Sequence, residues 1–564
     1  MRSTLALMLA LLWVLGSASS QAADTDLAAW LDELLVPWQD PAGPGIVVSA
    51  ARDDQILFTR AHGAAHVEHR VPITADTRFN AGSIAKSFTA YGILKLEAAG
   101  RLELDDRLDA HLDDLPSTLA HVTLRQLLQH TAGLKDDWTL ASLAGWENSD
   151  IRTHDQARRM ILRQTGLNFD PGARFGYSNS GYILLADVIA AVSGTSYAEW
   201  LETEVLVPLG LVDTLLPRSP LEMVQGLATP YEMRRAGAGA GSRRHLNLER
   251  SAVQSDVHGA GNLVTTAADL LRWGQHLLGT GNAMLQRMGE QAQLPGGTPS
   301  GYGLGLQVGQ LGDATLLHHG GALSGYRSQL LLIPDEQLVV VVLGNVNTLR
   351  PGAVATEVAD RLLSGRRPPG PEDDGPATTA DASLRHADLE EAAKYRGRYL
   401  MENGRMLTVE AAEGRLFMVM GGSLQELRPV DNNRFMLAGE GIPVAFERSN
   451  NGRMQQMTLE LPEHVMRAER LEPATVSGWD YRQYEGRYFS PALEVHYELV
   501  RDGEQLLARR SRGVDLEFTP IGDDRFLEWD PGDLVLKFER NRRGRVTGFT
   551  LSTSRARNVE FVRE

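Results

Sequence analysis

Cysteine is absent from the 564 residues of this chain. Its absence excludes disulfide bonds, thiolate metal sites and a lipid-anchored N-terminal cysteine. Positive charge is also scarce: 72 acidic residues against 56 basic ones give a net charge of −16. Such a balance argues against nucleic acid and anionic membranes as partners. Beyond the N-terminus, no apolar run reaches the roughly 20 residues that a membrane-spanning helix needs.

Several signature motifs are missing as well. The chain has no G-x-S-x-G elbow, no H-E-x-x-H pair and no P-loop, which disfavours α/β-hydrolases, zinc proteases and nucleotide-binding proteins. The glycine-rich stretch 234–244 lacks the flanking strand and helix of a phosphate loop, so we interpret it as a surface insertion. His62, His66 and His69 have no carboxylate or cysteine at ligand spacing, so we expect neither a metal nor a cofactor.

The N-terminus predicts export. Met1-Arg2, the apolar run from Leu5 to Leu15 and the small residues before Ala22 form the pattern of a signal peptide covering residues 1–22. The apolar run is too short to be kept as a spanning helix. We therefore expect a periplasmic or secreted protein without a membrane anchor, whose stability comes from burial alone.

Lysine is the rarest basic residue, with five among the 56, and Lys86 lies three positions after Ser83. Lysine, unlike arginine, can lose its proton. The apolar spacing that follows predicts a helix ending at Gly100, with Ser83 in its first turn and both side chains on one face. A desolvated amine at this distance can take the hydroxyl proton, and the helix N-terminus favours an oxyanion. The alternative is a helix-capping serine followed by a surface lysine.

Two further motifs bear on this choice. Tyr177-Ser178-Asn179 follows a Pro-Gly turn and precedes an apolar helical run, so it offers a phenol and an amide from a loop. His318-His319-Gly320-Gly321-Ala322 precedes two strand-like runs, and its glycines allow a substrate backbone to approach closely. Each motif alone is more often a turn or an edge strand.

The order Ser-x-x-Lys, Tyr-x-Asn, His-x-Gly resembles the penicillin-recognising serine hydrolases: class C β-lactamases, D-aminopeptidases, D-alanyl-D-alanine carboxypeptidases and related esterases. The resemblance covers residues 27–365 and includes connecting segments that look like those of the family. It implies an α/β (α+β) β-lactamase/transpeptidase-like fold, in which an antiparallel sheet flanked by helices carries a helical lobe. The site would lie between lobe and sheet. The connecting segments that look like those of the family are 127–134, 194–197, 208–211 and 261–269.

The resemblance also implies roles for individual residues. Ser83 would be the acylated nucleophile and Lys86 its base partner. Tyr177 would carry a proton between Ser83 and the leaving group, and Asn179 would hold Lys86 and a substrate amide. The oxyanion hole would combine the backbone N–H groups of Ser83 and Ala322.

The third motif can begin at His318 or His319. We place it at His319-Gly320-Gly321, because Gly325-Tyr326 then follow at the family's distance. We expect His319 on an edge strand, and we expect His319, Gly320 and Gly321 to bind the substrate. β-Lactamases of this family have a lysine there, whereas histidine is mostly neutral at neutral pH. Strong selection for carboxylated β-lactams is therefore disfavoured, and a substrate with a free amine or an uncharged ester fits better.

Composition and repeats divide the chain into a signal peptide, a catalytic domain at 23–365, a proline-rich linker at 366–388 and two copies of one small domain at 389–475 and 476–564. The motif Tyr395-Arg-Gly-Arg-Tyr399 recurs about 90 residues later as Tyr484-Glu-Gly-Arg-Tyr488. Alternating runs split by turns predict an antiparallel barrel of about eight strands for each copy. These barrels are either structural or shape the cleft by a loop.

Two classes of function stay open. One is an exported serine hydrolase that works through an acyl-enzyme on short D-residue-containing peptides or amides, or on esters. The other is a non-catalytic protein that binds a peptidoglycan fragment, although binding alone does not need Lys86. Among enzymes we rank D-aminopeptidase first, then esterase, D,D-carboxypeptidase and β-lactamase. The expected partner is a small peptide, amide or ester, and the oligomeric state is open.

Overall fold

The computed structural model describes residues 26–147, 149–235, 246–364 and 394–564, the last range with short gaps in and between the barrel strands. The expected signal peptide, the linker 366–388 and most of the glycine-rich stretch lie outside the described residues. The gaps after residue 394 are 402–405, 413–414, 421–422, 432, 438–441, 449–453, 461–464, 472–479, 523 and 529–533.

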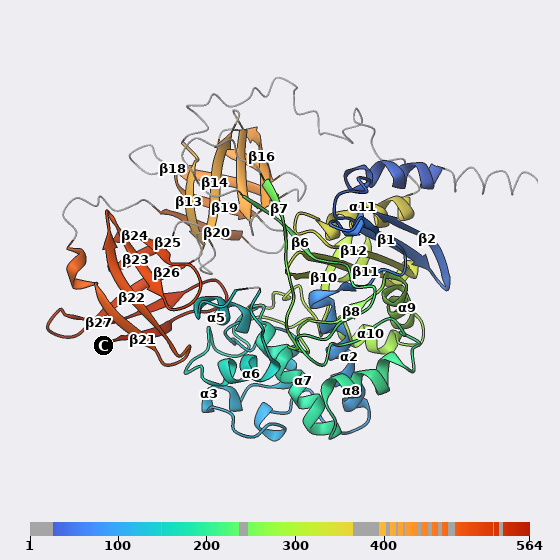
Figure 1. Ribbon diagram of the computed structural model, residues 1–564, viewed down its shortest axis with the longest axis horizontal. Helices are drawn as coiled ribbons and strands as arrows, with labels where there is room; N and C mark the ends of the chain where they lie inside the picture. The colour runs from blue at the N-terminus through green and yellow to red at the C-terminus, as the bar shows by residue number, and fades with distance from the viewer. Residues whose placement is uncertain are drawn as a thin grey trace, which may run out of the picture.

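A six-stranded antiparallel sheet forms the centre of the first domain (Figure 1). Its order is β2-β1-β12-β11-β10-β9, so strands from the two ends of the domain pair side by side. The fully buried β12 has the sequence Leu-Val-Val-Val-Val-Leu-Gly, as expected for a strand covered on both faces. The strands are β1 (Ile46–Arg52), β2 (Gln55–His62), β9 (Gln307–Leu311), β10 (Ala314–Leu323), β11 (Tyr326–Ile333) and β12 (Leu338–Gly344).

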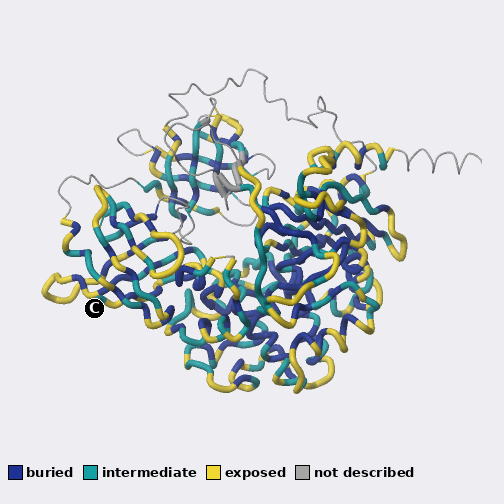
Figure 2. The backbone as a smooth tube through the Cα atoms, in the orientation of Figure 1, coloured by how far each residue is buried: buried dark blue, intermediate teal, exposed yellow. Residues whose placement is uncertain are grey.

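Helices cover both faces of this sheet. On one face α11 (Pro351–Ser364) and the helical segment 26–34 pack their apolar side chains over β12 and β1. On the other face α9 (Ala267–Leu278) packs against β1, β11 and β12 and joins the sheet to the core of the helical lobe. In Figure 2 many of the segments in the middle of this domain are drawn in the dark blue of buried residues.

The lobe consists of short helices between β5 and β8, ordered around the buried helix α7. Three two-stranded sheets complete the domain. The remaining helices are α2 (Ala85–Ala98), α3 (Ser117–Ala120), α4 (Leu124–Leu128), α5 (Asp137–Leu143), α6 (His154–Leu162), α7 (Asn179–Ser193), α8 (Tyr197–Leu201) and α10 (Asn282–Met288). The small sheets pair β3 (Ala64–His66) with β4 (Val71–Pro72), β5 (Phe79–Asn80) with β8 (Val264–Thr265), and β6 (Tyr231–Arg235) with β7 (Leu246–Arg250).

Within the described residues no single helix has the length and hydropathy of a membrane span, and one bent pair, Asn179–Ser193 with Tyr197–Leu206 at 77°, passes by length and composition alone.

Two closed eight-stranded antiparallel barrels follow, as the repeat predicts. The first contains β13 (Gly397–Met401), β14 (Met406–Ala412), β15 (Arg415–Met420), β16 (Ser423–Asp431), β17 (Arg434–Leu437), β18 (Ile442–Arg448), β19 (Met454–Glu460) and β20 (Val465–Leu471). The second contains β21 (Gly486–Ser490), β22 (Val495–Asp502), β23 (Gln505–Arg510), β24 (Leu516–Gly522), β25 (Arg525–Glu528), β26 (Val535–Arg540), β27 (Val546–Ser552) and β28 (Val559–Arg563).

The repeated Tyr-x-Gly-x-Tyr motif has a structural cause. In the first barrel the Tyr395 hydroxyl donates to Asn433 at 2.7 Å; in the second, Tyr484 donates to Asp524 at 2.6 Å. Both acceptors have positive φ, 62° and 58°, which asparagine and aspartate tolerate better than most residues. The second tyrosine of each motif donates to the backbone carbonyl of the first at 2.8 Å. The two copies therefore share one closing contact as well as one topology.

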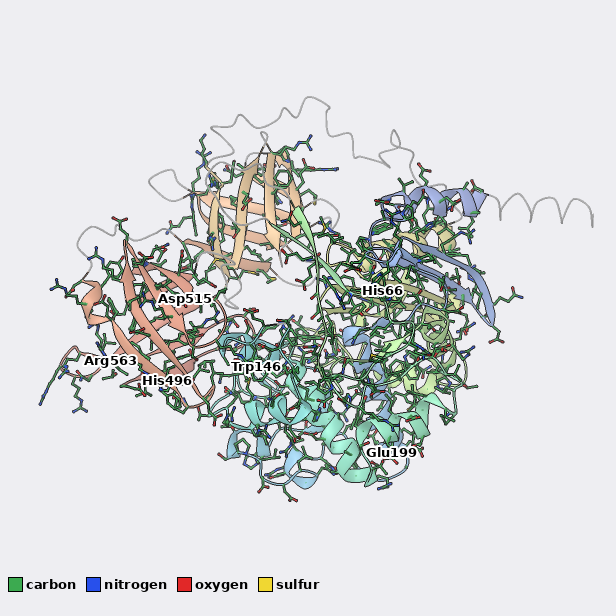
Figure 3. The ribbon with its side chains drawn as sticks, viewed as in Figure 1. His66, Trp146, Glu199, His496, Asp515 and Arg563 are labelled. Atoms are coloured by element: carbon green, nitrogen blue, oxygen red, sulfur yellow. The ribbon has the colours of Figure 1, made fainter. Side chains whose placement is uncertain are left out.

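The second barrel is continuous with the lobe, whereas the first has an apolar core of its own. Leu140, Leu143 and Met160 from α5 and α6 belong to the same buried cluster as the barrel interior. Trp146, labelled in Figure 3 on the lobe beside this barrel, lies under the guanidinium of Arg512, 4.4 Å from its ring centroid. The second barrel is thus packed onto the lobe as part of one folded body.

This shared core predicts a stability effect. Leu140 is 0% exposed, so Leu140→Ala should lower the free energy of unfolding by about 2–5 kcal/mol through lost apolar burial and a residual cavity. Urea unfolding followed by tryptophan fluorescence measures the change. Val212→Ala, at a side chain 80% exposed, is the control and should change it by less than about 0.5 kcal/mol. Equal stability of the two variants would contradict a shared core.

Candidate active site

A cavity of about 800 Å³ opens between the lobe and the sheet. Ser83 lines it from the start of α2, Tyr177 and Asn179 line it from the lobe, and the segment 319–325 lines it from β10 and the turn after it. The three sequence motifs therefore meet at one cavity, as expected for a site between lobe and sheet. A fourth contribution, Arg555, comes from the second barrel.

Ser83 lies in a 3-10 turn, η2 (Gly82–Ile84), immediately before α2, and so just outside the α-helix in which the sequence places it. Asn80 fixes this turn by accepting a hydrogen bond from the Gly82 backbone N–H at 2.9 Å. One helical turn later, the Lys86 amine donates to Ser83 Oγ at 3.2 Å. The expected serine–lysine pair is thus formed by local geometry.

Lys86 is 0% exposed, and its amine has three acceptors. Besides Ser83 Oγ, these are Asn179 Oδ1 at 2.8 Å and the Ala260 carbonyl at 2.6 Å. Burial disfavours the ammonium form and lowers the pKa of Lys86 to about 7, against the opposing charge of Asp136 and Asp137. A large fraction of the amine is therefore neutral and able to accept a proton near neutral pH.

Asn179, the first residue of α7, is held by a buried carboxylate that the sequence analysis missed. Asp136 Oδ1 accepts from both the backbone N–H and the side-chain Nδ2 of Asn179, at 2.7 and 2.9 Å. This contact fixes the amide so that its oxygen faces Lys86. Only the second Nδ2 hydrogen is left for the substrate amide that we expected Asn179 to bind.

Tyr177 hydrogen-bonds Ser83, and its ring centroid lies 5.0 Å from the Lys86 amine. Burial raises the pKa of this phenol, which keeps it protonated at neutral pH. The ring of His130 packs on Tyr177 at 4.2 Å between centroids, while its Nδ1 accepts from the Ser178 backbone N–H. The phenol is therefore positioned as a proton donor, and the buried amine beside it is the group that is present in its basic form near neutral pH.

The backbone of the turn containing Ser83 packs directly against the backbone of β10. A Cβ on Gly82 would lie 2.8 Å from the Ala322 nitrogen, and a Cβ on Gly321 would lie 2.0 Å from the Ala81 carbonyl oxygen. Ser328 on β11 donates to that same carbonyl at 2.7 Å. Only glycine fits at 82 and 321, and the result is that the Ala322 nitrogen lies beside the turn that carries Ser83.

One expectation about β10 is wrong in detail. β9, not β10, is the outer strand of the sheet, but it pairs with β10 only from Ala314 to His318. From His319 to Leu323 no strand of the described chain pairs with β10 on that side. The strand is thus interior at its start and open at its end, because β9 is shorter, and the open part lines the cavity next to Gly320 and Gly321.

His319 lines the cavity, whereas His318 does not. The His319 ring is 2% exposed: Nδ1 donates to the Gly320 carbonyl at 2.7 Å, so Nε2 accepts from the Tyr302 hydroxyl at 2.9 Å. Burial lowers the pKa of His319 to about 3. Both nitrogens are used inside the protein and the ring is neutral, so the part of this residue left for a substrate is its backbone.

The barrels contribute one loop to the cavity. Arg555, between β27 and β28, places its guanidinium 5.2 Å from the centroid of the Tyr177 ring. Its backbone carbonyl accepts from the Asp136 N–H at 3.0 Å and from Asn168 Nδ2 at 2.9 Å. The sequence left open whether the barrels are structural or shape the cleft by a loop. A loop of the second barrel lines the cavity, so this barrel helps to shape the cleft.

Four side chains in or next to the site were not predicted from the sequence: Asp136, His130, Tyr302 and Arg555. None stands at fixed spacing from a motif, and each reaches the site through tertiary packing. The only signal for His130 in the sequence is that its segment, 127–134, looks like a connecting segment of the family. Among the described residues, no group of three or more His, Cys, Asp or Glu could hold a metal ion, and His66 instead contacts Thr229 at 2.7 Å.

An antiparallel sheet with a helical lobe, and a serine and a buried lysine one turn apart at their junction, form the arrangement that the resemblance to penicillin-recognising serine hydrolases implies. The Beta-lactamase family model matches residues 31–364, and the chain belongs to this family. A D-aminopeptidase of Brucella anthropi is 27% identical over 547 residues, covering 93% of this chain and 96% of the relative.

Two other similarities cover less of the chain. Penicillin-binding protein 4* of Bacillus subtilis (strain 168) is 28% identical over 413 residues, which are 71% of this chain and 89% of the relative. An octameric penicillin-binding protein homologue from Pyrococcus abyssi has a similar fold, with a TM-score of 0.55 and 23% identity over 78% of this chain and 99% of its own. The architecture with two barrels thus accompanies similarity to a D-aminopeptidase over nearly the whole chain.

The buried amine predicts the pH dependence of the nucleophile. Because only neutral Lys86 can take the hydroxyl proton, labelling of Ser83 by an uncharged fluorophosphonate should rise about tenfold per pH unit below pH 7 and level off above it. Lys86→Arg should slow labelling by about 10²- to 10⁴-fold, since guanidinium keeps its proton. Stopped-flow labelling rates measure both effects.

Lys95→Arg is the matched control, because Lys95 lies on the same helix but is paired with Glu204 at 2.9 Å on the surface. Its labelling rate and pH profile should equal those of the wild type. A flat profile across this range, or normal labelling of Lys86→Arg, would remove Lys86 from the role of base.

Proposed function

We propose that this protein is an exported serine hydrolase that acts through an acyl-enzyme on short peptides or amides with a D-residue at the scissile bond. The observation that carries the proposal is the Lys86 amine, fully buried within hydrogen-bond distance of Ser83 Oγ and held by Asn179. A protein that only binds its ligand does not need a buried amine with a lowered pKa next to a serine.

Acylation begins when neutral Lys86 accepts the proton of Ser83 Oγ. The oxygen attacks the carbonyl carbon, and the carbonyl π electrons move to its oxygen, which becomes an oxyanion. The N–H groups of Ser83 and Ala322 stabilise this charge; the closeness of Gly82 to the Ala322 nitrogen supports this pairing. One such donor is worth about 10²- to 10³-fold in rate.

The tetrahedral intermediate then collapses, and the carbon–nitrogen bond breaks. Tyr177 gives its hydroxyl proton to the leaving nitrogen and regains one from protonated Lys86, which returns the amine to its neutral state. In deacylation, neutral Lys86 accepts a proton from water, which attacks the ester carbon. The bond from this carbon to Ser83 Oγ then breaks, Oγ takes the proton of Tyr177, and Tyr177 regains a proton from Lys86. The raised pKa of Tyr177 and the lowered pKa of Lys86 support this division of roles.

The choice of D-residue substrates rests on the relatives and on His319. The similarity to the D-aminopeptidase of Brucella anthropi covers 93% of this chain. A neutral His319 takes the place of the lysine that β-lactamases of this family have, which supports peptides and amides over carboxylated β-lactams. The signal-peptide pattern at residues 1–22 supports action outside the cytoplasm.

A panel of substrates tests the proposal: D- and L-aminoacyl p-nitroanilides, D-alanyl dipeptides, p-nitrophenyl acetate and nitrocefin. We expect kcat/KM for the D-aminoacyl amides and peptides to exceed that for their L-isomers by at least about tenfold. Ser83→Ala should abolish both turnover and fluorophosphonate labelling.

Ser117→Ala is the control, since Ser117 is an exposed serine at the start of α3 outside the cavity. It should label and turn over substrate as the wild type does. Labelling that persists in Ser83→Ala refutes the nucleophile, and a preference for L-isomers or for nitrocefin refutes the substrate class.

A further inference from the structure

The β27–β28 loop of the second barrel is anchored next to the nucleophile. Thr553 Oγ1 accepts from the N–H groups of Arg555 and Ala556 at 3.1 and 3.0 Å, which sets the conformation of the loop tip. Asp136 then donates its backbone N–H to the Arg555 carbonyl, and the same aspartate holds Asn179 through its side chain. The loop is therefore fixed by the residue that orients the partner of Lys86.

The Arg555 side chain is exposed to the cavity and has no carboxylate within ion-pair distance among the described residues. Its guanidinium lies over the face of Tyr177, 5.2 Å from the ring centroid. Arg152, which also lines the cavity, pairs with Asp137, and the cavity-lining Asp150 is paired with Arg512 at 3.2 Å. An arginine without a counterion, supported on an aromatic ring, is free to pair with a ligand anion in its own plane.

The remaining charges of the site leave few alternatives for an anion. His319 is neutral and uses both ring nitrogens internally, and Lys86 is buried behind Ser83. Arg327, at the sheet side of the cavity, donates to the Tyr326 carbonyl and lies in the field of Glu232. β10 carries the neutral His319 where β-lactamases of this family have a lysine. Arg555 of the second barrel instead brings a positive charge to the cavity, on the side where Tyr177 lies.

We propose that Arg555 is a specificity residue that binds a carboxylate on the leaving-group side of the substrate, so that the preferred substrates are short D-peptides with a free C-terminus. This inference rests on the proposed function. Tyr177 protonates the leaving nitrogen, and Arg555 lies over the same ring. In a leaving α-amino acid the carboxylate is separated from that nitrogen by a single carbon atom, which brings it within reach of a guanidinium placed there.

The test compares D-alanyl-D-alanine with D-alanyl-D-alaninamide, each with a free and an acetylated N-terminus. In the wild type, kcat/KM should favour the carboxylate over the amide by about 10- to 100-fold, the worth of a charged hydrogen-bonded pair. Arg555→Gln should bring this ratio to within about twofold of one, and Arg555→Lys should keep part of it. Because Arg555 also lowers the pKa of Lys86, its loss changes both rates, and the ratio separates binding from that effect.

Arg327→Gln is the matched control: it removes one positive charge from the same cavity and should keep the wild-type ratio. A wild-type ratio near one, a ratio unchanged in Arg555→Gln, or a ratio lost in Arg327→Gln instead would each overturn the proposal. A second pair, succinyl-D-alanine p-nitroanilide and its acetyl analogue, differs by a carboxylate on the acyl side of the scissile bond. If Arg555→Gln changes the kcat/KM ratio of this pair and not that of the dipeptide pair, the proposal is also overturned.

Binding separates this inference from the proposed function. Ser83→Ala binds the peptides without turning them over, so calorimetric Kd values for the same peptide pairs should show the same preference for the carboxylate. In the double variant Ser83→Ala/Arg555→Gln this preference should be lost. If the wild type hydrolyses D-peptides but neither the kcat/KM nor the Kd ratio responds to Arg555, the inference fails alone. If nothing is hydrolysed, the proposed function fails, and the Kd ratio still decides the role of Arg555.

Discussion

The burial of one amine is the constraint on which the site depends. Lys86 donates to three oxygen acceptors, and no carboxylate among the described residues bonds it directly, so it is hydrogen-bonded without being fixed as a cation. Asp136 acts on it at one remove, through Asn179. Desolvation pulls the pKa of Lys86 down and the two aspartates limit the fall, so that it stops near 7. A carboxylate in direct contact would restore an ordinary ammonium ion, and removal of both aspartates would make the buried charge still less favourable.

Much of the surrounding fold serves to keep that amine dry and its partners in reach. The Ala260 carbonyl that completes the shell comes from the loop before β8, far along the chain from α2. Asn262 follows in the left-handed region at φ 65° and bonds Asn80 at 3.0 Å, which ties this loop to the nucleophile turn. The close approach of Gly82 to Gly321 and Ala322 then brings the sheet into the same contact. Three segments distant in sequence are therefore positioned by backbone packing, which leaves little freedom to the groups at their junction.

The sequence was sufficient for features that are local or periodic. Ser83 and Lys86 are one helical turn apart, and the Tyr-x-Gly-x-Tyr repeat marks two barrels that close through the same contacts. Features created by tertiary contact were not predictable. Asp136 matters because α5 begins opposite the first residue of α7, and the interior position of β10 depends on the length of β9. His319 was expected to bind substrate, yet the Tyr302 hydroxyl that occupies it belongs to another segment.

The relation between the second barrel and the lobe shows why a domain without a catalytic motif can act on the site. The apolar residues of α5 lie in the barrel's own core, so the barrel cannot separate without exposing Leu140 and Leu143. Asp136, the residue that precedes α5, donates its backbone N–H to the Arg555 carbonyl in the barrel loop, and its side chain accepts from the N–H of Asn179. The position of Arg555 is consequently determined by the packing that positions Lys86. A single loop residue can thus bring a charge to the cavity without any change to Ser83, Lys86 or the sheet that holds them.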